Sequence, residues 1–411
     1  NVGHGDPARV MQKLPRLASL SDEQMRNELN THVLRADSPS PSVETLLHAL
    51  IPQKYVDNTH ADAVLAISNA PDGEKRIREI YGERVAGIPY IKAGFDLAAF
   101  CAREFPKALG KASVGVVLVS HGIVSFGASA RESYERMIEL VTMAEDYLAR
   151  KKAWQVALPE AQPARRERAE VAQIRRAVSE QAGAPMVLKA SDSAKALAFA
   201  RHPKVAALSQ QGPATPDHTI YSKRLPCFVP LEDPTSVERV IEAVTGAVER
   251  FVRDYTAYFE AHRHGEVMRP STAGGTGGPA TGPVHALIDP YPRVVLLPGL
   301  GMFTSGKDAR TAGIVADIYR HTASVIRAAS AIGAYASLTP KDAFAVSAYV
   351  RYRSDDYDSG VGPSKPLAGS GLAEQDAVSP GNQLGLLDDA RLPGGVQVVG
   401  QARDGVEALA V

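Results

Sequence analysis

Residues 112–148 read ASVGVVLVSHGIVSFGASARESYERMIELVTMAEDYL and contain the clearest strand and the clearest helix of the chain. The run at 114–119 is short, continuously apolar and rich in valine, which is typical of a central strand buried on both faces. Ser129 and Glu132 stand three residues apart, the spacing of a capping box, and predict a helix start. Apolar side chains then recur at helical spacing: Tyr134, Met137, Ile138, Val141, Ala144 and Leu148. We expect this helix to pack on the sheet that contains the valine-rich strand.

Strands and helices alternate along most of the remaining chain. Further strands, the last followed by a loop, are predicted at RVAGIPYI (84–91), PMVLKA (185–190), KVAALSQ (204–210) and the start of RVVLLPGLGMF (293–303). Further helices are predicted within LSDEQMRNEL (20–29), SVETLLHALI (42–51), SVERVIEAVTGAVERFVRDYTAYFEAH (236–262) and residues 308–338. The alternation favours an α/β fold with a mostly parallel sheet, and no internal repeat of fixed period is evident.

Composition excludes several classes of protein. The 411 residues suggest about two to three domains, and 46 basic against 46 acidic residues leave no excess charge for nucleic-acid binding. No apolar run reaches the ~18 residues of a membrane span, and no signal peptide opens the sequence, so we expect a cytoplasmic protein without membrane contact. Cys101 and Cys227 are expected to be buried, reduced thiols rather than a disulfide.

Four segments differ in composition. Residues 1–150 indicate a compact α/β domain, 151–183 a highly charged connector, and 184–346 a second α/β unit. Within the second unit, the glycine-rich run at 271–284 is expected to be a flexible loop. Residues 347–411 are rich in Gly, Ser, Pro and Asp and predict a linker or poorly ordered C-terminal tail.

Candidate chemical groups occur in three places: Glu44 and His48 in VETLLHAL, Asp57 and His60 in VDNTHADA, and His121 after the valine-rich strand. Glu44 and His48 are four residues apart on a predicted helix and would share one face. His121 lies at the carboxyl end of its strand, where ligand crevices form in α/β sheets. Imidazoles around a cation, with a carboxylate that moves a proton, suit a metal-dependent lyase. A lone histidine after a strand is more often structural, so spacing alone leaves both alternatives open.

Several runs together resemble the class II aldolase/adducin family. The longest is SVETLLHALIPQKYVDNTHADAVLAISNAPDGEKRIREIYGERVAGIPYIKAGFDLA (42–98). The others are SHGIVSFGASARESYERMIELVTMAEDYL, LSQQGPATPDHTIYSK, DPYPRVVLLPGLGMFTSGKDA and ADIYRHTASVIRAASAIGAYASLTPKDAF. The likeness is greatest to the aldolase half of the bifunctional rhamnulose-1-phosphate aldolase/short-chain alcohol dehydrogenases, and it covers about residues 16–346.

This resemblance implies an α/β/α sandwich whose first sheet is mostly antiparallel. It also implies a divalent ion, usually zinc, held by the three histidines of an His-x-His pair and an His-Gly strand. His60 and His121 fall on two of these ligands, Asn58 falls on the first histidine of the pair, and Glu44 falls on the catalytic glutamate. The implied reaction is retro-aldol cleavage of a ketose 1-phosphate, similar to rhamnulose 1-phosphate, to dihydroxyacetone phosphate and lactaldehyde. A small phosphorylated sugar and a homo-oligomer are the implied partners.

Asn58 departs from the family pattern. A neutral amide oxygen is a weaker zinc ligand than an imidazole nitrogen. Asp57 is adjacent but would point to the opposite face of a strand, so it is a poor substitute. We therefore keep two hypotheses: a metal-dependent aldolase, and a catalytically weakened adducin-like module with a structural or assembly role.

Two further family features have no counterpart in the sequence. Nothing in residues 1–40 resembles the glycine-rich segment that cradles the substrate phosphate, so we expect the first domain to be N-terminally incomplete. The glycine loop TGxxxGxG and the YxxxK pair of the dehydrogenase are also missing. We therefore expect a truncated bifunctional enzyme that binds no NAD.

Two loops hold the remaining candidates for substrate binding. In PGLGMFTSGKDA (298–309), the glycine spacing differs from the dinucleotide fingerprint and favours a plain tight loop, while Lys307 leaves a phosphate role open. In TPDH, Asp217 and His218 either line an active site or form an Asx-type turn. His48 is a further candidate for substrate binding.

Overall fold

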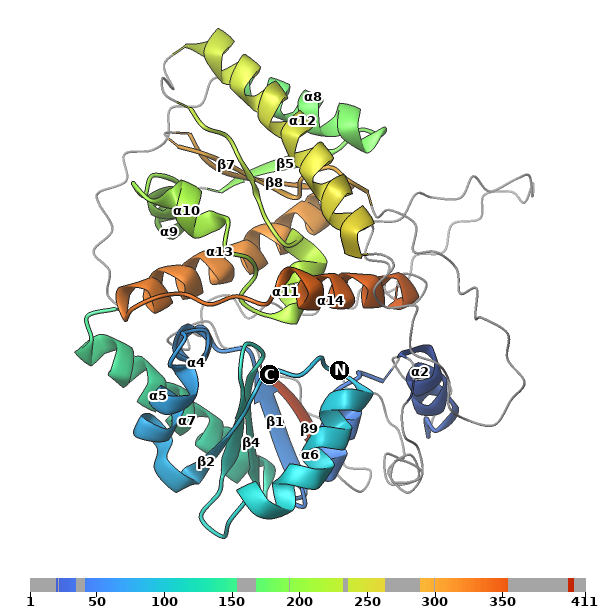
Figure 1. Ribbon diagram of the computed structural model, residues 1–411, viewed down its shortest axis with the longest axis vertical. Coiled ribbons are helices and arrows are strands. Elements are labelled where there is room, and N and C mark those ends of the chain that lie inside the picture. Colours follow the sequence, from blue (N-terminus) through green and yellow to red (C-terminus); the bar gives the residue numbers. More distant parts are fainter. Residues whose placement is uncertain are drawn as a thin grey trace, which may run out of the picture.

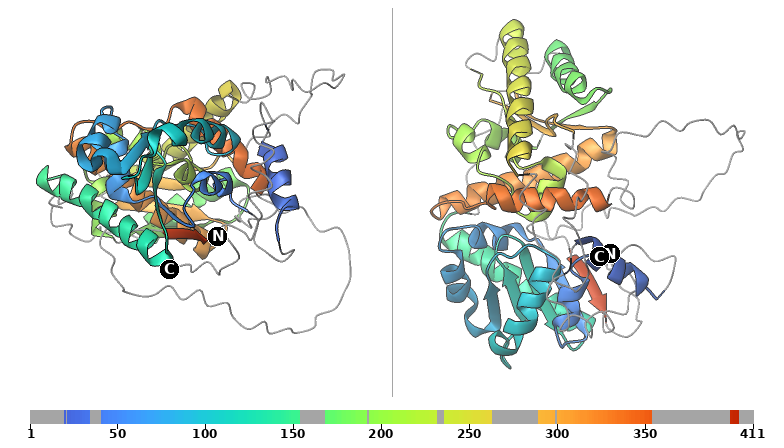
Figure 2. Two further views of the ribbon diagram at one scale, coloured as in Figure 1. Left: turned by 90° about the horizontal axis from the view of Figure 1, so that it is seen from below. Right: turned by 45° about the vertical axis from the view of Figure 1, so that its right-hand side comes forward.

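Two α/β units stack on one another in the computed structural model, and three helices of the second unit lie between the two sheets (Figures 1 and 2). These are α11 (Pro216–Ser222), α13 (Ala309–Ala331) and α14 (Pro340–Arg353). The structure describes residues 20, 22–34, 41–153, 168–191, 193–231, 236–262, 289–298, 300–353 and 398–402. The glycine-rich run at 271–284 and most of the tail at 347–411 lie outside these residues.

The first unit contains a sheet with the strand order β2-β3-β4-β1-β9. Its strands are β1 (Tyr55–Thr59), β2 (Val85–Ile88), β3 (Gly115–Leu118), β4 (Gly122–Gly127) and β9 (Val398–Ala402). Only β2 and β3 run parallel, and the other neighbours are antiparallel. The valine-rich run forms β3, which is buried throughout and central, as predicted. The predicted strand is the first half of the hairpin β3–β4, with Ser120 in the left-handed region (φ 57°) of its turn.

Helices cover both faces of this sheet. Val116 and Val124 belong to a core cluster with α3 (Thr45–Leu50) and α6 (Phe95–Ala108). Their neighbours Val117 and Ile123 belong to another, because successive strand residues point to opposite faces. The second cluster includes α4 (Asp62–Ser68), α5 (Gly73–Tyr81) and α7 (Ala130–Arg150). The predicted α/β/α sandwich is therefore present. Two remaining elements are α2 (Asp22–Thr31), which packs on α3 and α6, and the short 3₁₀ helix Gly82–Arg84.

The second unit contains a sheet with the strand order β5-β8-β7-β6. Its strands are β5 (Val187–Ser191), β6 (Cys227–Phe228), β7 (Val294–Leu297) and β8 (Gly301–Gly306). One face packs on α8 (Arg168–Ala182) and α12 (Val237–His262), and the other packs on α9 (Ala194–Ala200), α10 (Val205–Ser209) and α13. We expected 151–183 to be a connector, but its described helix α8 joins the core of this unit through Ile174 and Val178.

Three expectations about the second unit are wrong. KVAALSQ forms the short helix α10, in agreement with the helix propensity of its alanines and leucine. The predicted loop after RVVLL contains the strand β8. The sheet is mostly antiparallel, because a short turn joins β7 to β8 and such turns connect antiparallel neighbours.

The two units are repeats of one topology, which the sequence did not reveal. In each unit, a first strand and a helix are followed by two strands that pair in parallel. The second strand of this pair also forms a hairpin with the next strand, and a long helix follows the hairpin. Strands β1, β2, β3 and β4 correspond to β5, β6, β7 and β8, and both sheets have the same order. The segments between corresponding strands differ in length, so no fixed sequence period exists.

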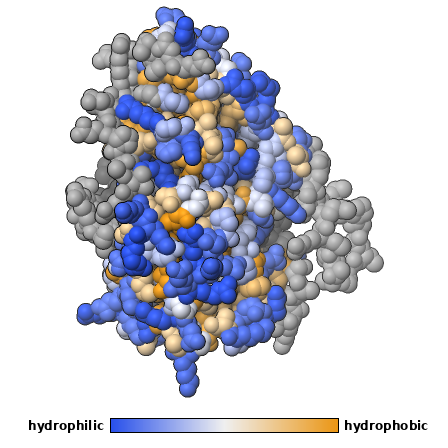
Figure 3. Space-filling model, turned by 60° about the vertical axis from the view of Figure 1, so that its left-hand side comes forward, coloured by the Kyte–Doolittle hydropathy of each residue, from blue (hydrophilic) through white to orange (hydrophobic). Residues whose placement is uncertain are grey.

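The surface carries few large apolar side chains. In the described part of the chain, Leu34 is the exposed large hydrophobic residue, at 66% relative exposure. Hydrophilic residues cover most of the face drawn in Figure 3, with hydrophobic residues in small separate patches. None of the described helices is long and apolar enough to cross a membrane. Cys101 and Cys227 are buried free thiols, which confirms that prediction.

Candidate active site

Two histidines meet at one edge of the first sheet. His60 directly follows β1, and His121 directly precedes β4. These strands pair with Thr59 opposite Ile123, so the two imidazoles come together with ring centroids 5.1 Å apart. A Cβ atom on Gly122 would lie 2.5 Å from the Thr59 carbonyl oxygen and 2.9 Å from the His60 ring. The His-Gly sequence therefore permits an approach that a larger residue would block.

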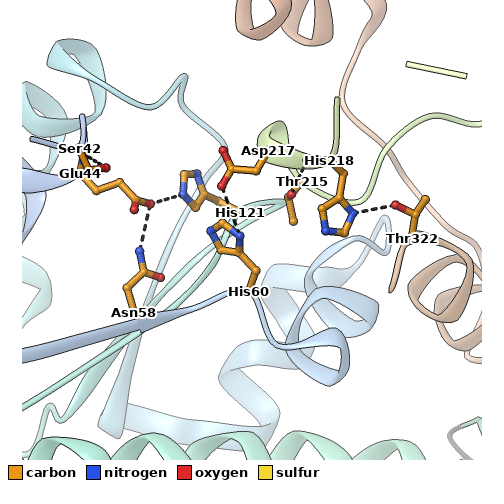
Figure 4. A network of polar contacts seen from close by, with 9 residues as sticks. All are labelled: Ser42, Glu44, Asn58, His60, His121, Thr215, Asp217, His218 and Thr322. Atoms are coloured by element: carbon orange, nitrogen blue, oxygen red, sulfur yellow. Dashed lines mark hydrogen bonds and ion pairs between the residues drawn. The ribbon is translucent and has the colours of Figure 1, made fainter. Parts of the chain in front are cut away.

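Glu44 lies between these histidines and Asn58 (Figure 4). Its Oε1 is 2.6 Å from Nε2 of His121 and accepts a hydrogen bond from Nδ2 of Asn58 at 3.0 Å. The helix α3 begins at Thr45, so Glu44 is its N-cap, and the His48 amide donates to the Glu44 carbonyl at 3.0 Å. The Ser42 hydroxyl accepts from the Glu44 amide at 3.2 Å, which fixes the start of the helix.

Burial and charge shape the electrostatics of this cluster. Burial raises the pKa of Glu44, but the hydrogen bond and charge of His121 outweigh it and hold the pKa well below its ordinary value. Burial lowers the pKa of His121, but contact with Glu44 outweighs it and raises the pKa above its usual range. Burial lowers the pKa of His60 and of His48, and this favours the neutral imidazole that binds metals.

Glu44, His60 and His121 fit a divalent cation. Each offers one ligand atom, and these atoms all lie within 4.8 Å of one another. Two imidazoles and one carboxylate are a common donor set of catalytic zinc sites. Oδ1 of Asn58 is buried and has no hydrogen-bond partner among the described residues, so this oxygen is available as a weak additional donor.

The second unit contributes side chains to the same site. Nδ1 of His60 lies 3.5 Å from Oδ2 of Asp217 at the start of α11. Nδ1 of His218 lies 2.7 Å from the Thr322 hydroxyl on α13, and burial lowers the pKa of His218 to about 3. The Thr215 hydroxyl caps α11 by accepting from the His218 amide at 3.2 Å. Of the two alternatives for TPDH, the geometry therefore places Asp217 and His218 beside the histidine pair (Figure 4).

Both halves of the chain match models of one protein family. The class II aldolase and adducin N-terminal domain matches residues 19–148, and the second domain of class II aldolases matches residues 164–349. The chain belongs to the class II aldolase/adducin family. The resemblance inferred from the motifs is thereby confirmed at the level of the family.

The chain is also similar to two other proteins. The chain is similar to the "Uncharacterized oxidoreductase YuxG" of Bacillus subtilis (strain 168), with 30% identity over 337 residues. The match covers 80% of this chain and 46% of YuxG, so the chain spans about half the length of that relative. It is also similar to the N-terminal class II aldolase domain of a conserved Thermoplasma acidophilum protein. That match has 34% identity and a TM-score of 0.33, and it covers 36% of this chain and 66% of the solved one.

Two residues weighed for this class II aldolase site lie elsewhere. Asp57 points to the far face of β1, as predicted, where it hydrogen-bonds Ser133 on α7. Lys307 is exposed just before α13. Thr322, which contacts His218 at the site, lies about 20 Å further along that helix, at 1.5 Å per residue. Gly306 beside Lys307 has a packing role, since a Cβ there would lie 2.5 Å from the Ala312 amide nitrogen. The geometry agrees with a plain tight loop. Gly299 lies outside the described residues.

Sequence reasoning missed one ion pair beside the site. Nδ1 of His321 on α13 lies 3.0 Å from both carboxylate oxygens of Asp62, two residues after His60. Asp62 is buried, and burial raises its pKa, while the hydrogen bond from His321 lowers it. Only the packing of α13 on α4 brings these residues together, and no local motif signals that contact.

Proposed function

We propose that this chain is a divalent-metal-dependent class II aldolase that cleaves a ketose 1-phosphate by a retro-aldol reaction. The observation that carries the proposal is the convergence of the partly buried Glu44 and His60 with the buried His121, whose ligand atoms lie within 4.8 Å of one another. Membership of the class II aldolase/adducin family supports the reaction type. YuxG carries the name of an oxidoreductase, but the residues of this chain that family models match are aldolase domains.

His60 and His121 would hold the ion, with Glu44 beside them. When bound, such an ion supplies Lewis acidity toward the carbonyl oxygen of the ketose. Glu44, which its low pKa keeps ionised, would accept the proton that the substrate hydroxyl releases as the carbon–carbon bond breaks and return it to the carbon next to this carbonyl. Asn58 orients this carboxylate through its amide N–H, and His121 orients it from the other side. Burial of the cluster limits the access of water to these groups.

We further propose a rhamnulose 1-phosphate-like substrate, with dihydroxyacetone phosphate and lactaldehyde as products. The support for this finer assignment is the motif resemblance across both halves of the chain. His218 and His48 are buried next to the site and are suited to contact the sugar hydroxyls. The position of Lys307 gives no support to a phosphate role at this site.

The test is release of dihydroxyacetone phosphate by the purified, zinc-loaded chain. Rhamnulose 1-phosphate is compared with fructose 1-phosphate, and Glu44→Gln is the matched variant because it keeps the shape of the side chain. We expect release that requires rhamnulose 1-phosphate, zinc and Glu44. A zinc-saturated chain that cleaves neither sugar would contradict the proposal.

A second candidate is an adducin-like structural module, and Asn58 is the observation that favours it. An amide in place of a ligand imidazole weakens metal binding. Metal analysis of protein from zinc-supplemented cultures separates the two functions. Stoichiometric zinc supports the enzyme, and a chain without zinc supports the module.

A further inference from the structure

We infer that Asp217 is the positioning residue of His60, so that the second unit completes the metal site of the first. The inference rests on the metal site of the proposed function. It concerns the contact between the Asp217 carboxylate and the His60 imidazole, two residues that are 157 positions apart in the sequence. No pattern in the sequence around either residue predicts that the two are in contact.

At two positions that correspond to the site of the first unit, the second unit carries apolar residues. In the β7–β8 turn, Leu300 stands where the β3–β4 turn has His121. The strand register places Ala190 opposite Phe303, as Asn58 lies opposite Val124 in the first unit. Leu300 is buried in the apolar cluster with α8 and α12. At these two described positions, the second unit presents no metal-ligating side chain, and its proposed contribution to metal binding is Asp217 at the start of α11.

A rigid frame holds Asp217 at this place. Thr215 caps α11, and Pro216 occupies the first turn, where its fixed φ is compatible with a helix start. One residue earlier, the Ala214 carbonyl accepts from the buried Asn69 side chain at 2.7 Å, which ties the loop to the first unit. His218 is bonded to Thr322 of α13 at 2.7 Å. The segment on both sides of Asp217 is thereby fixed.

The same frame holds His60. Helix α4 begins two residues after His60 and packs on α13 through Leu65, which shares a core cluster with Val325 and Ile326. The pair Asp62–His321 joins these helices again at 3.0 Å. Helix α4, which follows His60, and helix α11, which contains Asp217, thus both pack on α13. This packing holds the two backbones near each other, and the side chains of His60 and Asp217 meet at 3.5 Å.

This contact has a specific chemical consequence. A metal-ligating histidine usually donates its second ring N–H to a carboxylate or carbonyl, which fixes its tautomer and orientation. Asp217 faces Nδ1 of His60, so the proton is held there and Nε2 remains for the ion. Nδ1 of His121, by contrast, has no hydrogen-bond partner among the described residues. Of the two imidazoles, His60 is the one with a carboxylate at its second nitrogen.

Zinc affinity without substrate tests this assignment in the full chain. Asp217→Asn keeps the side-chain size but removes the charge and offers an amide in place of a carboxylate. We expect zinc affinity, by competition with a chromophoric chelator, to fall about tenfold, the lower end of the effect of such partners, because Asp217 is half-exposed. Asp217→Glu restores the carboxylate and should recover most of the affinity. Asp317→Asn is the matched control, because Asp317 is a similarly exposed carboxylate that pairs with Arg320 on α13.

A second readout follows the His60 ring directly. Nitrogen-15 spectra of the metal-free chain report the tautomer of each histidine, and His60→Gln assigns the His60 signal. We expect the Nδ1–H form in the wild type and a mixture of tautomers in Asp217→Asn, with equal thermal midpoints for both proteins.

The outcomes separate this inference from the proposed function. Unchanged zinc affinity and tautomer in Asp217→Asn, with a raised KM for the sugar, would show that Asp217 contacts substrate, and the inference would be wrong. A zinc-binding wild type without aldolase activity, in which Asp217→Asn binds zinc about tenfold more weakly, would refute the proposed function and leave this inference standing. A wild type that binds no divalent ion would overturn both.

Discussion

The two hairpin–helix segments of this molecule, β3–β4–α7 and β7–β8–α13, share their supporting contacts and differ in their turns. The Ser125 hydroxyl donates to the Ser133 carbonyl at 2.8 Å, and the Thr304 hydroxyl donates to the Ala312 carbonyl at 2.8 Å. Gly127 and Gly306 occupy the same place at the ends of β4 and β8. In both segments a polar side chain therefore bonds the first turn of the helix that packs on its strand.

The two segments differ in the residue that ends their turns. His121 precedes β4 beside Glu44, whereas Leu300 precedes β8 in an apolar cluster. The supporting residues hold the fold, and the turn residue carries the proposed function in the first unit. These two kinds of residue can vary independently because they lie at opposite ends of the same strand. This comparison predicts that equivalent substitutions have different effects at the turn and similar effects at the helix start.

The largest effects are expected at the turn. His121→Ala should lower aldolase turnover by about 10²–10³-fold, since it removes a group that supports charge stabilisation at the reaction centre. Leu300→Ala should leave zinc content and KM unchanged but cost about 2–5 kcal/mol of unfolding free energy, because it opens a cavity in a buried cluster. Kinetics of dihydroxyacetone phosphate release, zinc analysis and urea unfolding of both variants measure these effects. Loss of zinc in Leu300→Ala would break the proposed division of roles.

Large and similar effects are expected at the two glycines. A Cβ would lie 2.8 Å from the Ser133 amide nitrogen at Gly127 and 2.5 Å from the Ala312 amide nitrogen at Gly306. Because these obstacles are backbone atoms, Gly127→Ala and Gly306→Ala should each cost about 1–3 kcal/mol or more. Gly246→Ala in α12 is the control, since its Cβ would meet only the end of the Arg250 side chain at 3.4 Å. The thermal midpoints of the three variants measure the loss of stability. If alanine at Gly127 or Gly306 left the midpoint unchanged, the helix that follows that glycine would be able to shift.

Glu44, His60 and His121 could be anticipated from the motifs of the class II aldolase/adducin family, whereas spacing alone left their roles open. His60 and His121 follow and precede antiparallel partner strands, and both sit in recognisable motifs. Glu44 belongs to the helix that precedes β1, so it too is local to this edge. The position of Asp217 depends instead on how α11 and α13 dock on α4, and no local pattern encodes docking.

The errors in the fold have similar physical reasons. β8 reads GMFTSG, where a glycine at each end weakens the strand signal, although all six residues are buried. The helix α10 has five residues, too few to show helical periodicity in the sequence. The repeat cannot be recognised in the sequence, because the two units share the order of their strands but differ in the residues of their turns. The domain boundaries and the roles of the site residues stay predictions.

A moderate effect is expected at Asn58, whose counterpart in the second sheet is Ala190. Asn58→His replaces a neutral amide by an imidazole beside Glu44 and should strengthen zinc binding at least about tenfold, or roughly 1.4 kcal/mol. Asn58→Ala introduces the residue that the second unit has at the corresponding position 190. It should also remove the hydrogen bond that Asn58 donates to Glu44. Chelator competition compares the three proteins. Equal affinity in the wild type and Asn58→His would show that position 58 lies outside the coordination sphere.

The smallest effect is expected at the two helix caps, which differ in charge. The Ser129 hydroxyl accepts from the Glu132 amide at 3.1 Å, and the Asp308 carboxylate accepts from the Thr311 amide at 2.7 Å. This hydrogen bond lowers the pKa of Asp308 below its unfolded value. The stabilisation by Asp308 is therefore complete above the unfolded pKa, about 4, and is lost as the pH falls through the lower folded value. A serine hydroxyl does not titrate in this range, so Asp308→Ser should remove that part of the acid sensitivity, whereas Ser129→Asp should add a similar sensitivity to α7. Unfolding midpoints of the three proteins between pH 7 and pH 3 measure the effect, and identical pH profiles would show that the caps are equivalent in charge as well as in place.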